Sequence, residues 1–415
     1  MKRLLLAATA LLAACHTTPS TPRLATIPLA PAESLGFDSA GLAAVAAYVA
    51  SQVESAYPGA VVAVGRHGRL ALLAAAGRYG NDDPRPVDGA TIYDLASLTK
   101  VIGLTSACMI LVDEGRLDLD APVQRYLPEF KGPMKEQVTI RHLLTHSSGL
   151  PAWRPLFREA RGRGTALALV DTTPLDTAPG TRFVYSDLGA ITLMQVVEAI
   201  THERLDRFLA RRVFVPLGMT ATEFLPPKSR RNHIAPTEND TVFRHRMIRG
   251  EVHDENAGRM GGVSGHAGLF SNAPDLARFA VWLMHARTDT TSMCHGMVDA
   301  PYGKTYLPTP CSSLRVETAD LFTARQNLPP GSTRALGWDT PSDSGYSSAG
   351  TKLSRQSFGQ TGFTGTSIWM DPEQDLFVIL LTNRVHPTRA NTRILQVRAT
   401  VADLVVDAVK NGRRR

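Results

Sequence analysis

The most informative stretch of this chain is Asp94-Leu95-Ala96-Ser97-Leu98-Thr99-Lys100-Val101-Ile102-Gly103. It places the hydroxyl of Ser97 and the amine of Lys100 three residues apart, at the start of an apolar run. Residues at this spacing share one face of a helix, so the amine can reach the hydroxyl oxygen. Burial favours a neutral amine, and the field at a helix N-terminus favours a developing alkoxide. The stretch therefore predicts an activated serine nucleophile on a buried helix.

The same spacing also has a purely structural interpretation. Ser97 could cap the helix, while Lys100 could lie along the surface with its ammonium in solvent. A Ser-x-x-Lys pattern is short enough to occur by chance in a chain of 415 residues. The choice between the two interpretations therefore depends on the rest of the chain.

Composition and charge limit the classes of protein to consider. Hydrophobic residues make up 43% of the chain and charged residues 20%, as in ordinary globular proteins. The net charge is +7, and the basic residues are scattered apart from Arg413-Arg414-Arg415. Because no basic helix carries interleaved aromatic residues, we do not expect nucleic-acid binding.

The N-terminus has the pattern of an export signal. Lys2 and Arg3 precede the apolar residues 4–14, which are too few to span a bilayer. The segment ends in Leu12-Ala13-Ala14-Cys15, which resembles the lipobox of bacterial lipoproteins and implies lipidation of Cys15. The alternative is a plain secretory signal with an incidental cysteine.

We therefore expect residues 1–15 to be a lipoprotein signal that ends in the lipidated cysteine, which would anchor the protein to a membrane. The residue after Cys15 is His16 rather than Asp, which by the same resemblance favours the outer membrane, facing the periplasm. Residues 16–35 are rich in Thr, Pro and Ala and are expected to form a flexible tether.

The remaining cysteines leave one question open. Cys108 lies in the apolar run after Lys100 and is expected to be a buried small side chain. Cys294 and Cys311 could form a disulfide in an oxidising compartment, or remain free. No Cys/His spacing supports a structural zinc, and we predict neither a metal nor an organic cofactor.

Both ends of the chain predict strands and helices. A helix is expected over 39–54 and a hairpin over 60–65 and 70–74, while near the C-terminus strands are expected over 366–370 and 376–381 and a helix over 389–409. The fold class is therefore α/β of the α+β type, with one antiparallel sheet built from both termini and flanked by helices.

The middle of the chain predicts an inserted, mainly helical part. Apolar stripes at helical spacing run from Leu188 to Ile200 and from Leu276 to Met284. We expect a single catalytic domain over 36–412, whose α/β part comprises 36–96 and 352–412 and whose helical part comprises 97–351. Residues 286–336 are expected to form a long loop-rich excursion without a chemical role.

Several blocks now resemble the penicillin-binding and class C β-lactamase-like serine hydrolases. These blocks are Ser97-Leu98-Thr99-Lys100, the run from Val138 to Pro151 that contains His142-Leu143-Leu144-Thr145-His146-Ser147-Ser148-Gly149-Leu150, Tyr185-Ser186-Asp187, Pro216-Leu217-Gly218-Met219, Gly265-His266-Ala267-Gly268-Leu269-Phe270 and Gly359-Gln360-Thr361-Gly362-Phe363-Thr364-Gly365. The resemblance spans most of residues 36–410. That family has an antiparallel sheet flanked by helices with a helical insertion, in agreement with the patterns at the termini.

The resemblance implies catalytic roles for three residues. Ser97 would be the acylated nucleophile, Lys100 would receive or relay its proton, and Tyr185 would act as a base or proton shuttle. A buried aromatic with a satisfied hydroxyl is the alternative for Tyr185. The backbone N–H groups of Ser97 and Phe363 would stabilise the oxyanion, and Thr361 and Gly362 would lie against the substrate backbone.

Two positions depart from the family pattern. Asp187 stands where Asn is usual, and its carboxylate would pair with Lys100, keep it protonated and transfer more of the base role to Tyr185. Gln360 stands where Lys or His is usual, so the positive charge that the family places near the substrate carboxylate is missing. Recognition of a free C-terminal carboxylate is therefore open to question.

Two histidine patterns need separate interpretations. His142 and His146 have the spacing of a zinc helix, but Leu143 occupies the position where a metalloprotease needs Glu, so we do not expect metal. His253-Asp254-Glu255-Asn256 and His266 form a polar cluster that could flank the cleft, although a hydrogen-bond network that stabilises loops is favoured.

The sequence therefore predicts a serine hydrolase in the bacterial envelope, acting on D-Ala-D-Ala-type peptidoglycan peptides or on β-lactams. Two alternatives remain. The chain could be an esterase for small acyl esters, because Gln360 carries no charge. It could also be an inactive homologue that binds cell-wall fragments, although a binder needs neither the serine nor the lysine nor the tyrosine.

Overall fold

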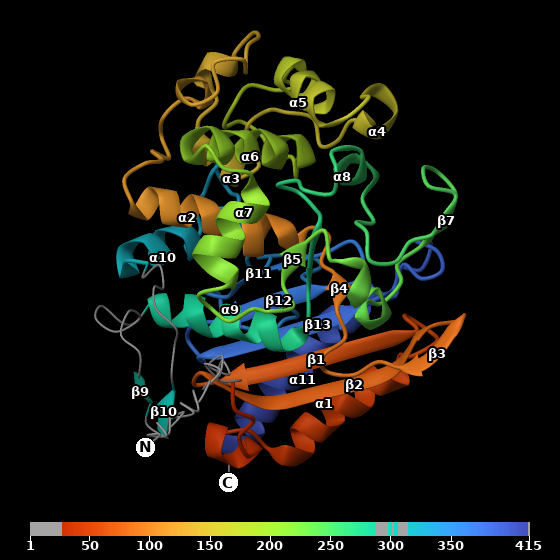
Figure 1. The fold of residues 1–415 in the computed structure, drawn as a ribbon. Helices are drawn as coiled ribbons and strands as arrows, with labels where there is room; N and C mark the ends of the chain where they lie inside the picture. Colours follow the sequence, from red (N-terminus) through yellow and green to blue (C-terminus); the bar gives the residue numbers. More distant parts are fainter. Residues whose placement is uncertain (1–26, 288–297, 301–302, 306–313, 414–415) are drawn as a thin grey trace, which may run out of the picture.

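A six-stranded antiparallel sheet forms the base of the molecule (Figure 1). The computed structural model describes residues 27–287, 298–300, 303–305 and 314–413. In order across the sheet, the strands are β11 (Phe358–Thr361), β12 (Ser367–Asp371), β13 (Leu376–Thr382), β1 (Gly59–Arg66), β2 (Arg69–Gly80) and β3 (Asp83–Pro86). Because β1 pairs with β13 in antiparallel register, the two ends of the chain share one sheet, as predicted.

Alternation along β1 explains why the sheet is covered on both faces. Val61 and Ala63 join the core on one face, while Val62 and Val64 join a second core on the other face. Successive strand residues point to opposite faces, so a strand whose residues are all apolar needs cover on both sides. Every residue of β1 is buried.

The helices from the two termini cover one face of the sheet. The helices α1 (Ser39–Ser51) and α11 (Ile394–Arg413) pack side by side there, and Asp38 caps α1 by accepting from the N–H of Gly41. On the opposite face lies α9 (Ala273–Ala286), which begins after its cap Asn272 and packs against β1 and β13 (Figure 1).

Most of the remaining helices, from α2 to α8, lie above α9 in Figure 1, whereas β9 and β10 lie below it. The short strands are β4 (Tyr93–Asp94), β5 (Glu223–Phe224), β6 (Asn239–Asp240), β7 (Arg246–Met247), β8 (Leu269–Ser271), β9 (Val298–Ala300) and β10 (Gly303–Thr305). The helices are α2 (Ser106–Asp113), α3 (Ile140–Leu144), α4 (Leu156–Glu159), α5 (Arg163–Thr172), α6 (Asp187–Thr201), α7 (Leu205–Leu209), α8 (Glu255–Arg259) and α10 (Val316–Thr323). Shorter or differently wound turns are η1 (Ala32–Leu35), η2 (Thr99–Thr105), η3 (Val123–Arg125), η4 (Lys135–Gln137), η5 (Ala210–Phe214) and η6 (Lys228–His233).

Three predictions about elements need correction. The last helix begins at Ile394 rather than near 389, because Arg389 instead binds the carboxylates of Glu238 and Glu255. The tether predicted over 16–35 is too long, since Leu29 pairs with Leu70 of β2 and η1 buries Leu35. Residues 286–336 contain α10 and are not a loop throughout.

Several predicted features lie outside the described residues or remain predictions. Cys15 and the predicted pair Cys294 and Cys311 belong to segments that the structure does not describe. Cys108 is free and fully buried in α2, as expected. Among the described residues, no helix is both long enough and apolar enough to cross a bilayer.

Candidate active site

Ser97 follows a tight turn at the end of β4. β4 pairs with β8, and the carboxylate of Asp94 then accepts from the N–H of Ala96 at 2.8 Å. Ala96 has a φ of +46°, in the left-handed region that side chains other than glycine rarely adopt. Such strained backbone gathers at functional sites. The turn leaves Ser97 half-buried, just before the π-wound first turns of the helix, η2.

Lys100 is buried beside Ser97, with only 3% of its surface exposed. Its Nζ donates to Ser97 Oγ at 3.1 Å and to the backbone oxygen of His266 at 3.1 Å. The same Nζ lies 2.7 Å from Oδ1 of Asp187, the first residue of α6. The serine and lysine are therefore in contact, as their spacing predicts.

Asp187 decides the charge of Lys100. Burial alone lowers the pKa of Lys100, but the nearby Asp187 carboxylate and the Tyr185 phenol outweigh it and raise that pKa above its usual value. The ion pair with Asp187 therefore favours a protonated Lys100 over the neutral amine that burial alone would favour. The expectation that a carboxylate at position 187 keeps the lysine protonated agrees with the geometry.

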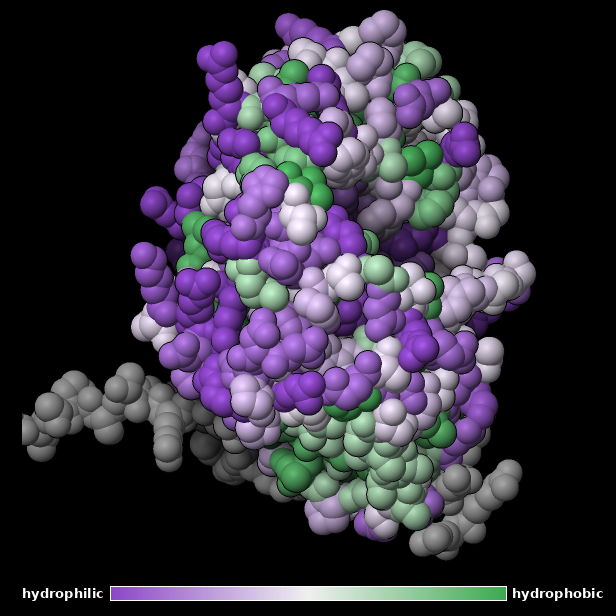
Figure 2. Space-filling model, turned by 90° about the vertical axis from the view of Figure 1, so that its right-hand side faces the viewer, coloured by the Kyte–Doolittle hydropathy of each residue, from purple (hydrophilic) through white to green (hydrophobic). Residues whose placement is uncertain are grey.

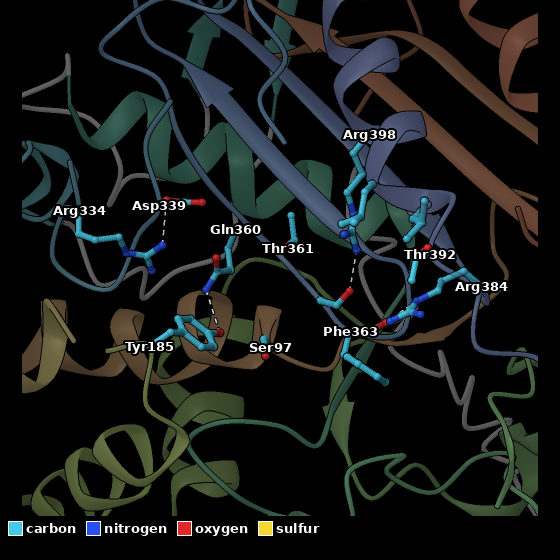
Figure 3. A pocket seen from close by; sticks show the side chains of 13 residues that line it. Ser97, Tyr185, Arg334, Asp339, Gln360, Thr361, Phe363, Arg384, Thr392 and Arg398 are labelled. Atoms are coloured by element: carbon cyan, nitrogen blue, oxygen red, sulfur yellow. Dashed lines mark hydrogen bonds and ion pairs between the residues drawn. The ribbon is translucent and has the colours of Figure 1, made fainter. Parts of the chain in front are cut away.

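Tyr185 faces the same group of residues. The centre of its ring lies 4.9 Å from Lys100 Nζ. The side-chain amide of Gln360, on β11, donates to the Tyr185 hydroxyl at 3.2 Å (Figure 3). The structure thus brings the predicted nucleophile, amine and phenol together with Asp187 and Gln360.

His146 holds the segment that carries Tyr185. Its backbone oxygen accepts from the N–H of Val184 at 2.8 Å, and its Nδ1 accepts from the N–H of Ser186 at 3.1 Å. The imidazole also packs on the Tyr185 ring, with 4.5 Å between ring centres. Burial lowers the pKa of His146 well below its usual value, and Arg334 and Lys100 lower it further. A neutral imidazole keeps Nδ1 free to accept.

A cavity of about 480 Å³ opens beside Ser97 (Figure 3). It is lined by Ser97, Tyr185, Arg334, Asp339, Gln360, Thr361, Gly362, Phe363, Arg384, Thr392, Ile394, Leu395 and Arg398. The predicted substrate-binding residues from β11 and the turn after it therefore line the cavity, whereas Asp187 contacts Lys100 instead. In the view of Figure 2, the surface is hollowed between the helical part above and the sheet below.

Arg334 is the main cavity residue that the sequence analysis missed. It lies in the segment 286–336, for which no chemical role is predicted, and it lines the cavity. Its guanidinium is 2.9 Å from the Asp339 carboxylate and 5.9 Å from the centre of the Tyr185 ring. The signal was the adjacent run Ala335-Leu336-Gly337-Trp338, whose apolar residues are fully buried and draw the arginine inward.

Two backbone N–H groups are available at the cavity. Within the described parts of the chain, neither the N–H of Ser97 nor that of Phe363 donates to a protein acceptor. Both residues line the cavity. Unpaired N–H groups that converge on a serine can stabilise negative charge on a bound carbonyl oxygen.

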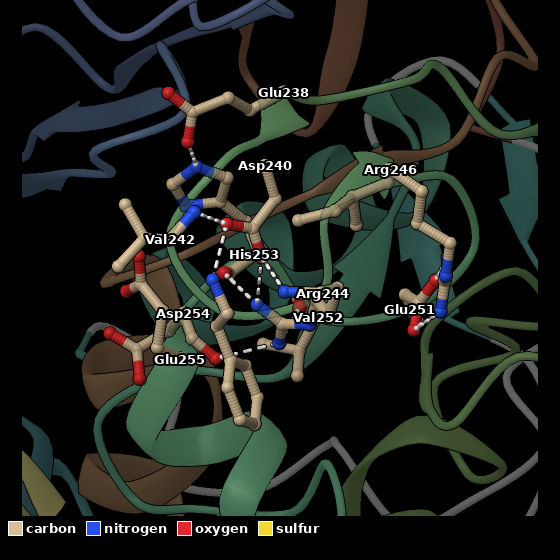
Figure 4. Close-up of polar contacts among 12 residues, drawn as sticks. Glu238, Asp240, Val242, Arg244, Arg246, Glu251, Val252, His253, Asp254 and Glu255 are labelled. Atoms are coloured by element: carbon tan, nitrogen blue, oxygen red, sulfur yellow. Dashed lines mark hydrogen bonds and ion pairs between the residues drawn. The ribbon is translucent and has the colours of Figure 1, made fainter. Parts of the chain in front are cut away.

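The polar cluster around His253 and His266 forms a network that reaches the site through Asp94 and Lys100. Figure 4 shows the part of it around His253 and Glu238. His253 pairs with Glu238 at 2.9 Å, and its N–H donates to Asp94 at 2.6 Å. His266 contacts Asp254 at 2.9 Å, and its backbone oxygen accepts from Lys100. The network therefore supports the loops that hold the serine turn and the lysine.

One group near this network has the composition of a metal site. Side-chain atoms of Asp187, Asp254 and His266 lie within 4.8 Å of one another. However, Asp187 is paired with Lys100, and Asp254 is bonded to His266 and to the N–H of Ala257. The Lys100 ammonium therefore already provides the positive charge that a metal ion would bring to these side chains.

Comparisons with known proteins show the family to which the chain belongs. A model of the Beta-lactamase family matches residues 43–402. A relative from Salmonella agona (strain SL483), provisionally named D-alanyl-D-alanine carboxypeptidase, is 30% identical over 397 residues, which is 87% of each chain.

Solved structures share the fold. A penicillin-binding protein homologue from Caulobacter crescentus superposes with a TM-score of 0.67 at 17% identity, covering 91% of this chain and 99% of its own. EstCE1, a hydrolase with promiscuous acyltransferase activity, superposes with a TM-score of 0.66 at 24% identity, covering 88% of this chain and 99% of its own. A class C β-lactamase from Rhodobacter sphaeroides gives 0.65 at 22% identity, with the same coverage. The chain belongs to the Beta-lactamase family and is a serine hydrolase.

Proposed function

We propose that this hydrolase forms an acyl-enzyme on Ser97 and acts as a D-alanyl-D-alanine carboxypeptidase. One observation carries the proposal: Lys100 Nζ lies 3.1 Å from Ser97 Oγ and 2.7 Å from Asp187, under the Tyr185 ring. A cationic donor on the nucleophile and a phenol beside it supply the two groups that acylation needs.

In the acylation step, Ser97 Oγ bonds to the substrate carbonyl carbon while its O–H bond breaks. We assign the departing proton to the oxygen of Tyr185, which reacts as the phenolate with the Lys100 ammonium nearby. The electron pair of the carbonyl double bond moves to the carbonyl oxygen. The N–H groups of Ser97 and Phe363 hold the negative charge that develops there.

The tetrahedral intermediate then breaks down. The electron pair returns to re-form the carbonyl, the bond to the leaving nitrogen breaks, and that nitrogen takes the proton from Tyr185. A water molecule repeats the sequence on the acyl-enzyme: its proton passes to Tyr185, its oxygen bonds to the acyl carbon, and Ser97 leaves with the proton. Lys100 stays protonated throughout as a hydrogen-bond donor, because Asp187 holds its charge.

Two features support a peptide with a free carboxylate as substrate. The name of the Salmonella agona relative includes this activity. Arg334 also places a guanidinium beside Tyr185, in the region where Gln360 leaves the family's usual charge missing. β-Lactams resemble the same peptide and would acylate the same serine.

A second candidate is an esterase that acts on small acyl esters. The uncharged Gln360 favours it, since esters need no carboxylate recognition. The structural neighbour EstCE1 is described as a hydrolase with acyltransferase activity. An inactive binder is disfavoured, because the nucleophile, the amine and the phenol are all present and in contact range.

Labelling with a fluorescent penicillin and with a fluorophosphonate, followed by peptide mapping, tests the proposal. We expect both probes to label Ser97, the Ser97→Ala variant to remain unlabelled, and a D-Ala-D-Ala peptide to release D-alanine. Labelling by the fluorophosphonate alone, with turnover of an ester, would favour the esterase. If neither probe modifies Ser97, the acyl-enzyme is refuted.

We also propose that the protein is exported and anchored to the outer membrane through lipid on Cys15. Support comes from the lipobox-like Leu12-Ala13-Ala14-Cys15 and from His16 after it. Metabolic labelling with an alkyne-tagged palmitate should mark the wild-type protein in the membrane fraction and should fail for Cys15→Ala. Equal labelling of both would contradict the anchor.

A further inference from the structure

The peptide unit between Gly362 and Phe363 supplies one of the two candidate oxyanion donors. Its N–H belongs to Phe363 and has no acceptor among the described residues. Its C=O belongs to Gly362, and the bond is trans, since the two cis bonds in the described residues both precede proline. In a planar trans peptide the N–H and C=O point in opposite directions. Whatever holds the Gly362 oxygen therefore also aims the Phe363 N–H.

Two donors hold that oxygen: the N–H of Gly365 at 3.0 Å and the guanidinium of Arg398, the one side chain among the described residues that reaches it. Arg398 lies in the first turns of α11, and its Nη2 donates to the Gly362 oxygen at 2.6 Å and to the Thr366 oxygen at 2.9 Å (Figure 3). Both bonds are charge-assisted, which makes them stronger than neutral ones. One guanidinium nitrogen thus bridges the two ends of the turn 362–366, which the bond from the Gly362 N–H to the Thr366 oxygen also joins at 2.8 Å.

The cost of burying Arg398 points to a specific role. Only 7% of the residue is exposed, its Nε has no partner, and among the described residues no carboxylate forms an ion pair with it. Burial lowers its pKa to about 10, which still leaves it charged at neutral pH. An unpaired buried charge is destabilising, so its hydrogen bonds to the turn must compensate.

The opposite side of the turn is tied to the nucleophile segment. Thr364 Oγ1 donates to the backbone oxygen of Asp94 at 2.6 Å, and Thr366 Oγ1 donates to the backbone oxygen of Leu95 at 3.0 Å. These two oxygens come directly before the strained Ala96 and the N–H of Ser97. The turn that carries the Phe363 N–H is therefore hydrogen-bonded on one side to the segment that carries the Ser97 N–H. On its other side it is hydrogen-bonded to Arg398 of α11.

We infer that Arg398 is a positioning residue for the oxyanion hole: it fixes the Gly362 carbonyl so that the Phe363 N–H faces the reacting carbonyl oxygen, and it polarises that same peptide. The inference rests on the proposed acyl-enzyme at Ser97. Arg398 acts through the peptide and does not touch the substrate. Its effect should appear where negative charge develops, in the transition state, and not in ground-state binding.

The Arg398→Gln variant tests this role. Loss of one complete oxyanion donor costs about 10²–10³ in rate, so we expect misalignment to lower kcat and the acylation rate by roughly 10- to 100-fold with KM nearly unchanged. Affinity for a phenylboronic acid, which forms a tetrahedral anionic adduct on serine, should fall in parallel. Arg398→Lys keeps the charge on a shorter side chain and should give an intermediate loss.

Arg384→Gln is the matched control. Arg384 Nε donates at 2.8 Å to the Phe363 oxygen, which belongs to the next peptide along the same turn. The N–H of that peptide is not the candidate oxyanion donor. Loss of the Arg384 hydrogen bond should therefore lower the acylation rate distinctly less than loss of Arg398. The melting temperature of each variant shows whether the fold is intact. If Arg398→Gln does not fold, the rates of Arg398→Lys test the positioning role instead.

The outcomes separate the two proposals. Unchanged acylation rate and boronate affinity in folded Arg398 variants, or an equal loss in Arg384→Gln, would overturn the positioning role while leaving the acyl-enzyme intact. If neither the penicillin nor the fluorophosphonate labels Ser97 in the wild-type protein, the proposed function itself fails, and the positioning role fails with it.

Discussion

The charge on Lys100 is the residue property on which the proposed chemistry depends most. Asp187 sits 2.7 Å from its Nζ and outweighs the effect of burial, so the lysine is a donor rather than a base. In the proposed mechanism the base role passes to Tyr185, whose hydroxyl accepts from Gln360. Under that proposal, a single carboxylate in place of an amide at position 187 changes which group moves the proton.

Replacing Asp187 by Asn should change the pH profile. Without the carboxylate, burial lowers the pKa of Lys100, and the ammonium that donates to Ser97 is lost at lower pH. We expect the alkaline fall in kcat/KM to move to lower pH, within the range from about pH 7 to about pH 10. Rates of nitrocefin or ester turnover across that range measure it. Superimposable profiles would show that Asp187 does not set the charge.

Replacing Arg334 by Gln should weaken binding of substrates with a free carboxylate. A charge-assisted hydrogen bond contributes about 1.5–3 kcal/mol, so KM for a D-Ala-D-Ala peptide should rise roughly 10-fold or more. KM for the methyl ester of the same peptide serves as the internal control and should change little. An equal rise for both substrates would mean that Arg334 only supports the cavity wall.

At the level of elements, two separate segments orient the residues of the site. The segment around His146 binds both neighbours of Tyr185 through Val184 and Ser186. The turn 362–366 binds the strand end before Ser97. These contacts explain why motifs far apart in sequence occur together: each motif supplies the hydrogen bonds that orient another.

His146→Asn should make stability less sensitive to acid. The pKa of His146 is lowered on folding, so its contribution to stability is complete above about pH 6.5 and is lost as pH falls below that value, because the unfolded chain takes up the proton first. Asn tolerates the left-handed backbone at this position, where φ is +55°, and does not titrate. The difference in melting temperature between neutral and acidic buffer should therefore shrink in the variant. No change in that difference would contradict a neutral, buried His146.

For the molecule as a whole, two large apolar cores lie on opposite faces of the sheet, and the active site adjoins one of them. One core, between the sheet and the pair α1 and α11, contains Leu42, which is 3% exposed. The other core surrounds the nucleophile helix and includes Leu98 and Val101. The sheet separates the two, and Arg398 reaches from α11 to the active-site turn.

Leu42→Ala should destabilise the protein without altering its chemistry. Large-to-small changes of this kind in a core cost about 2–5 kcal/mol in the free energy of unfolding. Denaturant unfolding should show that loss, while kcat at low temperature stays within about twofold. A fall in kcat comparable to that of a site variant would contradict the separation of the two cores.

Much of this fold was predictable because it depends on local patterns. Short continuous apolar runs mark β1 and β13, and the spacing of Ser97 and Lys100 predicts their contact. Arg398 could not be found in this way, because a buried arginine has no periodic signal and its role depends on long-range contacts. For Arg334 the apolar run that follows it was the only local signal. The start of α11 was misplaced for the same reason, since Arg389 is bound to distant Glu238.

The acylation rate of Ser97 in a Tyr185→Phe variant is the most direct test of the proposed proton transfer. Rapid-quench mass spectrometry with a penicillin would follow the Ser97 adduct in both proteins. General-base assistance contributes about 10²–10⁴ in rate, so the variant should acylate at least roughly 100-fold more slowly while forming the adduct on the same serine. Acylation of Ser97 at the wild-type rate without the phenol, or modification of a different residue, would contradict the mechanism.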